Sequence, residues 1–425
     1  MATPTTFPVH RTQIAGIPIS HLAETFGTPT YFYDSEKIAE RVNDLKKFDV
    51  IRFAQKANSN IAILDFVRRQ GVLVDAVSVG EIHRAVSAGY QLNGTPSPIV
   101  YTADIFDRDA LDFLRKNPVH CNAGSPEMIT QLGEIRPNAE ITLRINPGFG
   151  HGHSQKTNTG GDSSKHGIWH EQLPECINRA AAAKVKISGL HMHIGSGTDF
   201  EHLSMVCASM KSTALSIGPS ITTISAGGGL PTPYRESDKM IDIDRYFEIW
   251  DATRKELETA FHHPICLEIE PGRYLSAESG YLLSEIRAVK KMGDKLYYLV
   301  DAGFNNLARP IMYGSYHPIS ISHRAANDSN VTPTVEAIVG GPLCESGDIF
   351  TQEEGGFVCS RELPAAKVGD FLIIECAGAY GFVMSSNYNS KPFAAEVLLH
   401  EQTPYPIRER QTNEDLIRGE KIPSF

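Results

Sequence analysis

A lysine directly after a short apolar run is the first residue of this chain that suggests chemistry. Val50–Ala54 has the length and composition of a buried strand, Lys56 follows it, and a helical pattern begins soon afterwards. Lysine is rarely buried unless it is paired or functional, and a desolvated amine forms a Schiff base with an aldehyde more readily. Taken alone, residues 52–58 are more consistent with an ordinary lysine whose ammonium lies in water.

Three consecutive glycines provide a second chemical feature. Gly227, Gly228 and Gly229 follow another apolar run, and a glycine turn lets backbone N–H groups approach an anion closely. Arg273 adds a fixed positive charge suited to a phosphate or a carboxylate, and Ser196 offers a hydroxyl donor. A run of glycines is more often only a flexible turn. The three glycines therefore indicate an anion-binding site only in combination with other functional residues.

A carboxylate and two histidines extend the set. Glu270 lies near the end of an apolar run, where a carboxylate is costly unless it has a partner, and a pyridinium nitrogen is such a partner. An amine, an anion-binding turn and a carboxylate for a ring nitrogen together match the needs of pyridoxal 5'-phosphate. A flat imidazole at His193 is suited to stack on the cofactor ring, whereas His191 is interpreted as a core residue.

A long loop contains most of the remaining clustered histidines. His151, His153 and His166 lie between Gly148 and Gly167, among Gly, Ser and Asn residues and without a nearby group of carboxylates. This composition does not match a metal site, so none is predicted. The loop is too long for a simple connection, and we therefore consider it as a lid over a pocket.

These residues can act together only in a fold that brings the ends of several strands close to one another. The chain contains eight β-rich runs. They are residues 50–54, 72–77, 99–101, 119–122, 141–145, 187–193, 221–226 and 265–269. Short strands rich in Val and Ile that alternate with helices predict a parallel sheet, and eight of them suit a closed (β/α)₈ barrel of the TIM type. A doubly wound open sheet is the alternative, but its Gly-rich fingerprint is missing after the first strand.

The pattern changes after Gly280. Strand-like runs separated by loops rich in Gly, Asn, Ser and Pro occur at residues 281–289, 295–300, 334–339, 371–376 and 394–399. We predict a barrel domain that binds the cofactor over residues 31–280. An all-β sandwich or barrel domain is predicted from residues 1–30 and 281–425, because chain termini often dock together.

Composition limits the classes of function. The 425 residues are 41% hydrophobic and 21% charged, as in a soluble globular protein, and the formal net charge of -10 argues against a nucleic-acid partner. No segment has the length of a membrane span or the form of a signal peptide, so a cytoplasmic protein is expected. Seven scattered cysteines without a CxxC pair argue against a disulfide framework and a thiolate zinc site.

The second predicted domain holds candidate residues of its own. Cys344 stands beside Glu345 in a loop rich in Gly and Pro, although an inert loop thiol is the favoured interpretation of this pair alone. Arg309 and Tyr313 lie in another loop segment, and Tyr380 lies between glycines after an apolar run.

Taken together, these motifs resemble the diaminopimelate decarboxylase family, a group of fold-type III pyridoxal-phosphate decarboxylases, and most of all its enterobacterial type. The similarity runs nearly end to end, and the matching segments are residues 52–58, 146–167, 191–197, 225–229, 268–273, 312–317, 341–348 and 378–390. Any one of these segments is weakly specific, whereas the whole set is highly specific.

The resemblance implies a role for each candidate. Lys56 would bind the cofactor covalently, Glu270 would pair with its ring nitrogen, and His193 would stack on the ring. The resemblance implies that the remaining cofactor contacts come from Ser196, Gly227, Gly228, Gly229, Pro271, Gly272, Arg273 and Tyr380. It implies that the substrate contacts come from Arg273, Arg309, Tyr313, Glu345 and Tyr380.

The resemblance further implies a homodimer with shared active sites. Cys344 and Glu345 would reach the partner subunit's pocket, with Cys344 as proton donor. The implied reaction converts meso-2,6-diaminopimelate to L-lysine and carbon dioxide, the last step of bacterial lysine synthesis, without nucleic acid or membrane as partner. An amino-acid racemase, a decarboxylase for another diamino acid and a non-catalytic cofactor carrier are the alternatives. The racemases of this fold place an arginine at the ring nitrogen, where this chain has Glu270.

Overall fold

The computed structural model describes residues 7–149, 160–193, 199–324 and 333–425, which form two compact units. The first unit contains the described residues between Ala39 and Thr232, together with Met240–Leu275. The second contains the described residues up to Ile38, the segment Pro233–Lys239, and the described residues from Ser276 to Phe425. Each unit has its own sheet.

The first unit is a closed barrel of eight parallel strands. They are β4 (Val50–Ala54), β5 (Leu73–Ala76), β6 (Ile99–Ala103), β7 (His120–Ala123), β8 (Glu140–Asn146), β10 (Lys186–His191), β11 (Thr223–Ser225) and β12 (Cys266–Ile269). Pairing of β8 with β10 and of β12 with β4 closes the ring. The predicted barrel is confirmed, with all eight strands where the sequence indicated them. A two-residue strand, β9 (Ile168–Trp169), adds to β8 and was not predicted.

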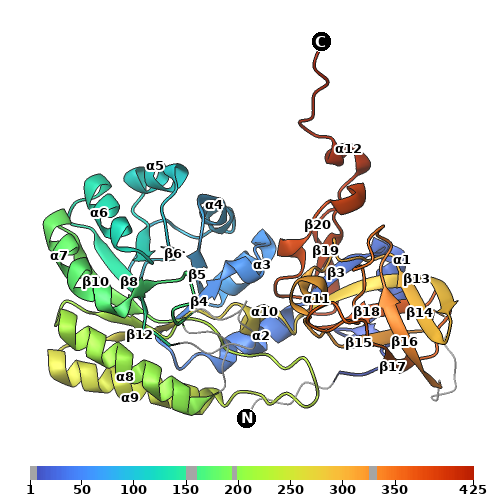
Figure 1. Ribbon diagram of the computed structural model, residues 1–425, viewed down its shortest axis with the longest axis horizontal. Coiled ribbons are helices and arrows are strands. Elements are labelled where there is room, and N and C mark those ends of the chain that lie inside the picture. Colours follow the sequence, from blue (N-terminus) through green and yellow to red (C-terminus); the bar gives the residue numbers. More distant parts are fainter. Residues whose placement is uncertain (1–6, 150–159, 194–198, 325–332) are drawn as a thin grey trace. The chain divides into compact units, whose positions relative to one another are not determined.

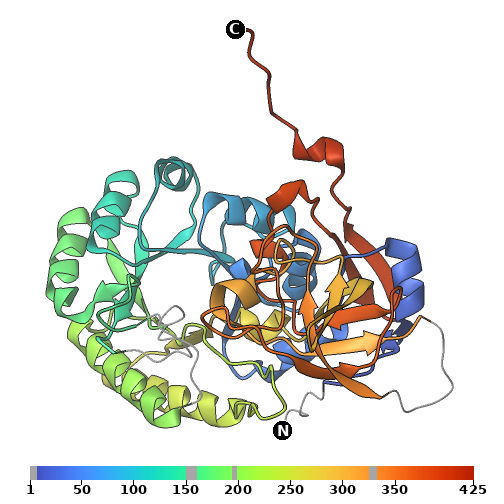
Figure 2. The same cartoon turned by 45° about the vertical axis from the view of Figure 1, so that its right-hand side comes forward.

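Helices surround these strands as an outer arc (Figure 1 and Figure 2). They are α3 (Ile61–Arg69), α4 (Val79–Ser87), α5 (Arg108–Lys116), α6 (Pro126–Ile135), α7 (Leu173–Ala183), α8 (Phe200–Ile217) and α9 (Ile243–Phe261). Side chains at their amino ends explain several starts, because Asn60, Ser78 and Asp107 each accept a hydrogen bond from a first-turn N–H. One face of α3, with Ile63, Leu64 and Val67, is buried.

The second unit is built on a mixed sheet in the strand order β17-β16-β14-β13-β3-β19-β20, with β18 pairing with β13 and β15. The strands are β3 (Thr30–Asp34), β13 (Gly280–Met292), β14 (Lys295–Val300), β15 (Ile319–Ser322), β16 (Thr334–Gly340), β17 (Arg361–Pro364), β18 (Phe371–Ile374), β19 (Ala395–His400) and β20 (Thr403–Arg408). Helix α1 (Ile19–Phe26) packs its apolar face into this unit's core. The predicted second domain built on β-strands is confirmed, with a few short helices added to its sheet.

The boundary between the units differs from the predicted one at residue 31. Strand β3 pairs with β13 and β19 and so belongs to the second sheet. All five of its residues are buried, so the sequence shows no alternation, and helix α2 (Ser35–Asp44) follows at once, as after a barrel strand. Near the carboxyl end of the chain, α12 (Asn413–Leu416) is a short helix whose start is capped by Thr412.

Within the described ranges, no helix combines the length and the apolar composition that crossing a membrane requires.

Candidate active site

Backbone hydrogen bonds join the carboxyl ends of three adjacent barrel strands. The N–H of Ala54, at the end of β4, donates to the carbonyl of Pro271 at 3.1 Å. On the other side of β12, the N–H of Glu270 donates to the carbonyl of Gly227 at 2.8 Å. The turn that carries Lys56, the segment from Glu270 and the glycine turn are therefore held side by side, as expected for strand ends in such a barrel.

The glycine turn needs its glycines for steric reasons. Gly227 and Gly229 have φ angles of +64° and +93°, which side chains disfavour. A Cβ at Gly228 would lie 2.6 Å from the carbonyl oxygen of Glu270 and 2.9 Å from Cε1 of His193. The N–H groups of Gly227 and Gly228 already donate, to the Ser225 hydroxyl and to Nδ1 of His193, so their predicted role in binding phosphate stays a prediction.

His193 lies beside this turn as a neutral ring. Because Nδ1 accepts a hydrogen bond from the Gly228 N–H at 2.9 Å, the proton of the neutral imidazole is on Nε2. Burial lowers the pKa of His193 well below its usual range, and the positive charges of Arg144 and Lys56 lower it further. A neutral, oriented imidazole is suited to stack on an aromatic ring.

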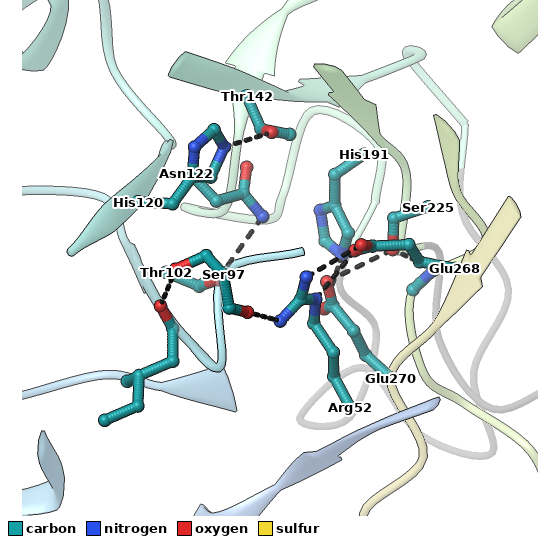
Figure 3. A network of polar contacts seen from close by, with 12 residues as sticks. Arg52, Ser97, Thr102, His120, Asn122, Thr142, His191, Ser225, Glu268 and Glu270 are labelled. Atoms are coloured by element: carbon teal, nitrogen blue, oxygen red, sulfur yellow. Dashed lines mark hydrogen bonds and ion pairs between the residues drawn. The ribbon is translucent and has the colours of Figure 1, made fainter. Parts of the chain in front are cut away.

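Glu270 is a buried carboxylate with two polar neighbours. Its Oε1 accepts from the Ser225 hydroxyl at 3.1 Å, and its Oε2 lies 2.9 Å from Nε2 of His191, an ion-pair distance (Figure 3). Burial alone would raise the pKa of Glu270, but His191, Arg52 and Ser225 together hold it below its usual value. The site therefore presents an ionised carboxylate at the end of β12.

His191 does not only pack in the core but also contacts a residue of the site. It is 1% exposed, as a core residue would be, yet its ring is directed at the Glu270 carboxylate. The sequence signal was its spacing of two residues from His193, but spacing does not reveal a partner on another strand. This contact is the feature of the site that the sequence analysis missed.

A second buried ion pair lies deeper in the barrel (Figure 3). The Arg52 guanidinium binds both carboxylate oxygens of Glu268 at 2.7 Å and donates to the Ser97 carbonyl at 2.6 Å. These residues line a cavity of about 730 Å³ in the barrel interior. The cavity lining also includes His120, Asn122, Thr142 and Glu270. The inside of this barrel is therefore polar and partly hollow, unlike the packed apolar centre of most TIM barrels.

Lys56 lies in the short 3₁₀ turn Gln55–Ala57 directly after β4, and its side chain is exposed. Burial raises the pKa values of the Asp75 and Glu81 carboxyl groups, and the positive charge of Lys56 partly opposes that rise. Asp75 belongs to β5 and Glu81 to α4, so the next strand and helix each place a carboxyl group within electrostatic range of the amine.

Hydrogen bonds hold both ends of the predicted lid, the segment between Gly148 and Gly167. The Asn146 side-chain oxygen accepts from the N–H groups of Gly148 and Gly161, at 3.1 and 3.0 Å. Nδ1 of His166 lies 2.8 Å from a carboxylate oxygen of Asp104. The central part of the lid, with His151 and His153, lies outside the described residues, and so does the predicted cofactor contact Ser196.

The second unit holds the predicted substrate residues other than Arg273, which lies in the first unit. Arg309 and Tyr313 lie four residues apart on helix α11 (Arg309–Tyr313), and therefore on one face. Tyr380 has a φ of +56°, in a turn where a Cβ at Gly378 would lie 1.9 Å from the Ser276 carbonyl oxygen. A close backbone approach thus explains the glycine at position 378.

Cys344 and Glu345 are exposed on an ordered loop of the second unit. The Asp348 carboxylate accepts hydrogen bonds from the N–H groups of Leu343 and Phe304, at 2.8 and 2.7 Å. The Cys344 N–H donates to the Asn389 side chain at 2.8 Å. The loop therefore presents a thiol and a carboxylate at its surface from a fixed backbone.

The residues of the first unit fit pyridoxal phosphate. The cofactor needs an amine, a carboxylate for its ring nitrogen and a flat group against the ring, and Lys56, Glu270 and His193 supply these at joined strand ends. All seven cysteines are free thiols. In the described part of the chain, no group of three or more His, Cys, Asp or Glu is arranged to hold a metal ion.

Residues 35–277 match the family of pyridoxal-dependent decarboxylases, in its pyridoxal-binding domain. Diaminopimelate decarboxylase of Escherichia coli strain K12 is 49% identical over 97% of this chain and 98% of its own length. The enzyme of the same name from Streptomyces coelicolor is 49% identical, over 96% of this chain and 92% of its own.

Solved structures give the same result. A crystal structure of diaminopimelate decarboxylase has a TM-score of 0.91 and 49% identity, and the match covers 94% of this chain and 95% of that one. The Helicobacter pylori enzyme complexed with L-lysine has a TM-score of 0.81 and 30% identity, over 94% of this chain and 98% of that one.

Proposed function

Because this chain belongs to the diaminopimelate decarboxylase family of pyridoxal-dependent decarboxylases, we propose that it converts meso-2,6-diaminopimelate to L-lysine and carbon dioxide. In bacteria this is the last step of lysine synthesis. The observation that carries the proposal is the ionised Glu270, buried beside His191 and Ser225 and joined to the glycine turn. The pyridoxal-dependent class follows from the match over residues 35–277.

The role of Glu270 distinguishes this chemistry from racemisation. When bound, pyridoxal phosphate supplies an electron-accepting ring that stabilises the negative charge left on carbon after carbon dioxide departs. A carboxylate whose pKa is held low remains charged and keeps a proton on the ring nitrogen that it contacts. An arginine there, as in racemases of this fold, would repel that proton, so Glu270 favours decarboxylation.

We infer that Lys56 binds the cofactor aldehyde through its amine and that neutral His193 holds one face of the ring. Arg273 provides the charge for the cofactor phosphate, together with the backbone of residues 227–229 and Gly272. Tyr380 and Ser196 complete this set as phosphate contacts. The support is the joined strand ends of the first unit and the resemblance of these segments to the family.

We further propose roles for the substrate residues. Arg309 and Tyr313 recognise the carboxylate at the end of the substrate remote from the reacting carbon, because guanidinium and carboxylate pair with matching geometry. Arg273, Glu345 and Tyr380 provide the other substrate contacts.

We propose that two copies of the chain form a dimer in which Cys344 and Glu345 of each serve the other's site. The exposed Cys344 thiol donates the proton that takes the place of the departing carboxylate. A cysteine is well suited to this step, since its ordinary pKa lies near that of a general acid working at neutral pH.

The first test is the release of carbon dioxide by the purified protein with added pyridoxal phosphate. We expect release from meso-diaminopimelate and little from ornithine or a siderophore-type diamino acid precursor. No turnover of meso-diaminopimelate, with turnover of another diamino acid, would replace the substrate assignment by that of a sister decarboxylase. Bound cofactor without turnover of any of them would favour a carrier.

The second test addresses the shared site. Cys344→Ala should slow turnover strongly while the cofactor stays bound, and mixing it with Lys56→Ala should restore about a quarter of the activity, since half of the exchanged dimers contain one intact site. No recovery in dimers shown to have exchanged subunits would contradict the sharing.

A further inference from the structure

The guanidinium of Arg309 is enclosed within the second unit by Tyr234 and His317. Arg309 and His317 are 5% and 2% exposed. Nη1 of Arg309 lies 3.0 Å from the Tyr234 hydroxyl and 2.9 Å from Nε2 of His317. The guanidinium carbon also lies 4.9 Å from the centre of the Tyr234 ring, and that ring meets the His317 ring edge-on at 5.3 Å. An arginine expected to bind substrate is thus oriented by two neighbours.

The protonation of His317 follows from its two contacts. Nδ1 lies 3.0 Å from the backbone carbonyl of Glu375, and a carbonyl only accepts, so Nδ1 carries the proton. A guanidinium only donates, so Nε2 must accept from Arg309. His317 is therefore a neutral imidazole with its lone pair directed at Arg309. A proton on Nε2 would set an N–H against a cation.

The carbonyl that orients His317 is itself fixed. The N–H of Glu375 donates to the Pro318 carbonyl at 2.9 Å. Its carboxylate binds the Arg11 guanidinium at 2.8 and 2.9 Å and the Ser320 hydroxyl at 2.8 Å. His317 thus connects Arg309 on helix α11 to the backbone of Glu375, which follows strand β18. Glu375 is in turn held in place by its own hydrogen bonds.

We propose that His317 is a positioning residue for substrate recognition. Its Nε2 lone pair sets the direction of the Arg309 guanidinium, and through it the affinity for the carboxylate at the remote end of the substrate. The inference rests on the proposed function, in which Arg309 binds that carboxylate. An arginine loses much side-chain freedom on binding, and one that is oriented beforehand binds more tightly for the same contacts.

Two amide substitutions separate the two hydrogen bonds of His317. In His317→Gln, the side-chain oxygen reaches the position of Nε2 and accepts from Arg309. In His317→Asn, the shorter amide reaches the position of Nδ1 and donates to the Glu375 carbonyl, but leaves Arg309 without this acceptor. We expect His317→Asn to raise KM for meso-diaminopimelate about tenfold with kcat changed less than about twofold, and His317→Gln to stay within about threefold of the wild-type KM.

Ligand binding provides a readout that general damage would not reproduce. L-Lysine keeps the remote carboxylate of the substrate, whereas 1,5-diaminopentane has no carboxylate. By calorimetry with the holoenzyme, His317→Asn should weaken L-lysine binding about tenfold and leave 1,5-diaminopentane binding unchanged. Equal weakening of both ligands would overturn the proposal, since the effect would then not depend on the carboxylate.

Arg309→Gln separates a failure of this inference from a failure of the proposed function. If Arg309→Gln leaves KM unchanged, Arg309 does not bind substrate and the proposed substrate site is wrong. If Arg309→Gln raises KM and His317→Asn does not, only the positioning role is wrong. The double variant should be no worse than Arg309→Gln alone, because His317 acts through Arg309, and additive losses would overturn the proposal.

His317→Leu replaces His317→Asn if the latter does not fold. Leucine keeps most of the bulk and makes neither hydrogen bond. A raised KM with unchanged kcat in this variant supports the positioning role, and an unchanged KM overturns it.

Discussion

The inside of the barrel and the main hydrophobic cluster of the second unit are filled by different side chains. Inside the barrel, Arg52 pairs with Glu268, and His191 lies against Glu270. One cluster of buried residues in the second unit is apolar throughout: Ile14, Ile17, Ile19, Leu22, Ala23, Phe32, Tyr281, Leu283, Phe371, Ile373, Val397 and Leu399. Both regions are buried, but the barrel interior holds charged pairs and this cluster does not. The buried charges of the second unit, such as Glu375 with Arg11, lie outside the cluster.

This difference follows from how each sheet is covered. Each barrel strand has two faces, so β12 directs Glu268 and Glu270 inward while Leu267 and Ile269 belong to the apolar core. The barrel obtains its apolar burial from the layer between strands and helices, and its interior is left for polar groups. Buried charge costs stability unless it is paired, and in the barrel both Glu268 and Glu270 have a basic partner.

The largest expected effect is a loss of catalytic activity in a protein that still folds. Lys56→Ala should lower kcat by about 10⁴-fold or more and abolish the absorbance of the covalently bound cofactor, since no other amine replaces it. Lys56 is exposed, so the melting temperature without cofactor should change little. Full activity of Lys56→Ala would show that the barrel site is wrongly assigned.

The buried ion pair tests the cost of charge directly. Arg52→Met leaves Glu268 charged and unpaired, and should destabilise the protein by about 3–5 kcal/mol in urea denaturation. The double variant Arg52→Met/Glu268→Leu should recover most of this loss.

A substitution in the hydrophobic cluster of the second unit leaves no unpaired charge, so no second substitution is expected to restore its stability. Leu283→Ala should cost about 2–5 kcal/mol by leaving a cavity. If Arg52→Met/Glu268→Leu is as unstable as Arg52→Met, the stability of the barrel interior depends on packing rather than on charge pairing. The proposed difference between the two regions would then be wrong.

Glu270→Gln tests whether the charge or only the shape of this residue matters. Glutamine retains hydrogen bonding to Ser225 but has no negative charge for the ring nitrogen. We expect kcat to fall about a hundredfold, with a smaller change in KM, measured as carbon dioxide release at saturating cofactor. An unchanged kcat would remove the carboxylate from the reaction.

The smallest expected effect is a pH dependence of stability. Burial, with the charge of Arg52 adding to it, lowers the pKa of His120 to about 4 from the ordinary 6.5. The unfolded chain therefore binds a proton below pH 6.5 that the fold does not bind. His120 thus contributes its full stability above pH 6.5, and the contribution declines as the pH falls towards 4.

His120→Gln provides the matched measurement. Between pH 7.5 and 4, the stability of the wild type relative to this variant should decline by about 2 kcal/mol, allowing for the partly exposed ring. A constant difference would show that the imidazole is not held neutral in the barrel interior.

The sequence by itself determined most element types and supplied the candidate residues of the site. The barrel strands are short apolar runs between helical patterns, so local pattern was sufficient to place all eight. Lys56, Glu270 and the glycines 227–229 were identified because each is an unusual residue at a strand end, where barrels gather their functional groups. A strand without alternation, such as β3, has no such local signal for its sheet.

Only the tertiary structure decided which side chains meet. Arg52 and Glu268 are 216 residues apart, and His317 lies between Arg309 and the Glu375 carbonyl. Local periodicity specifies which face of a strand or helix a residue occupies, but not which residue it faces after the ring closes. The ionised state of Glu270 and the tautomer of His317 depend on those partners, and so they follow from the folded arrangement alone.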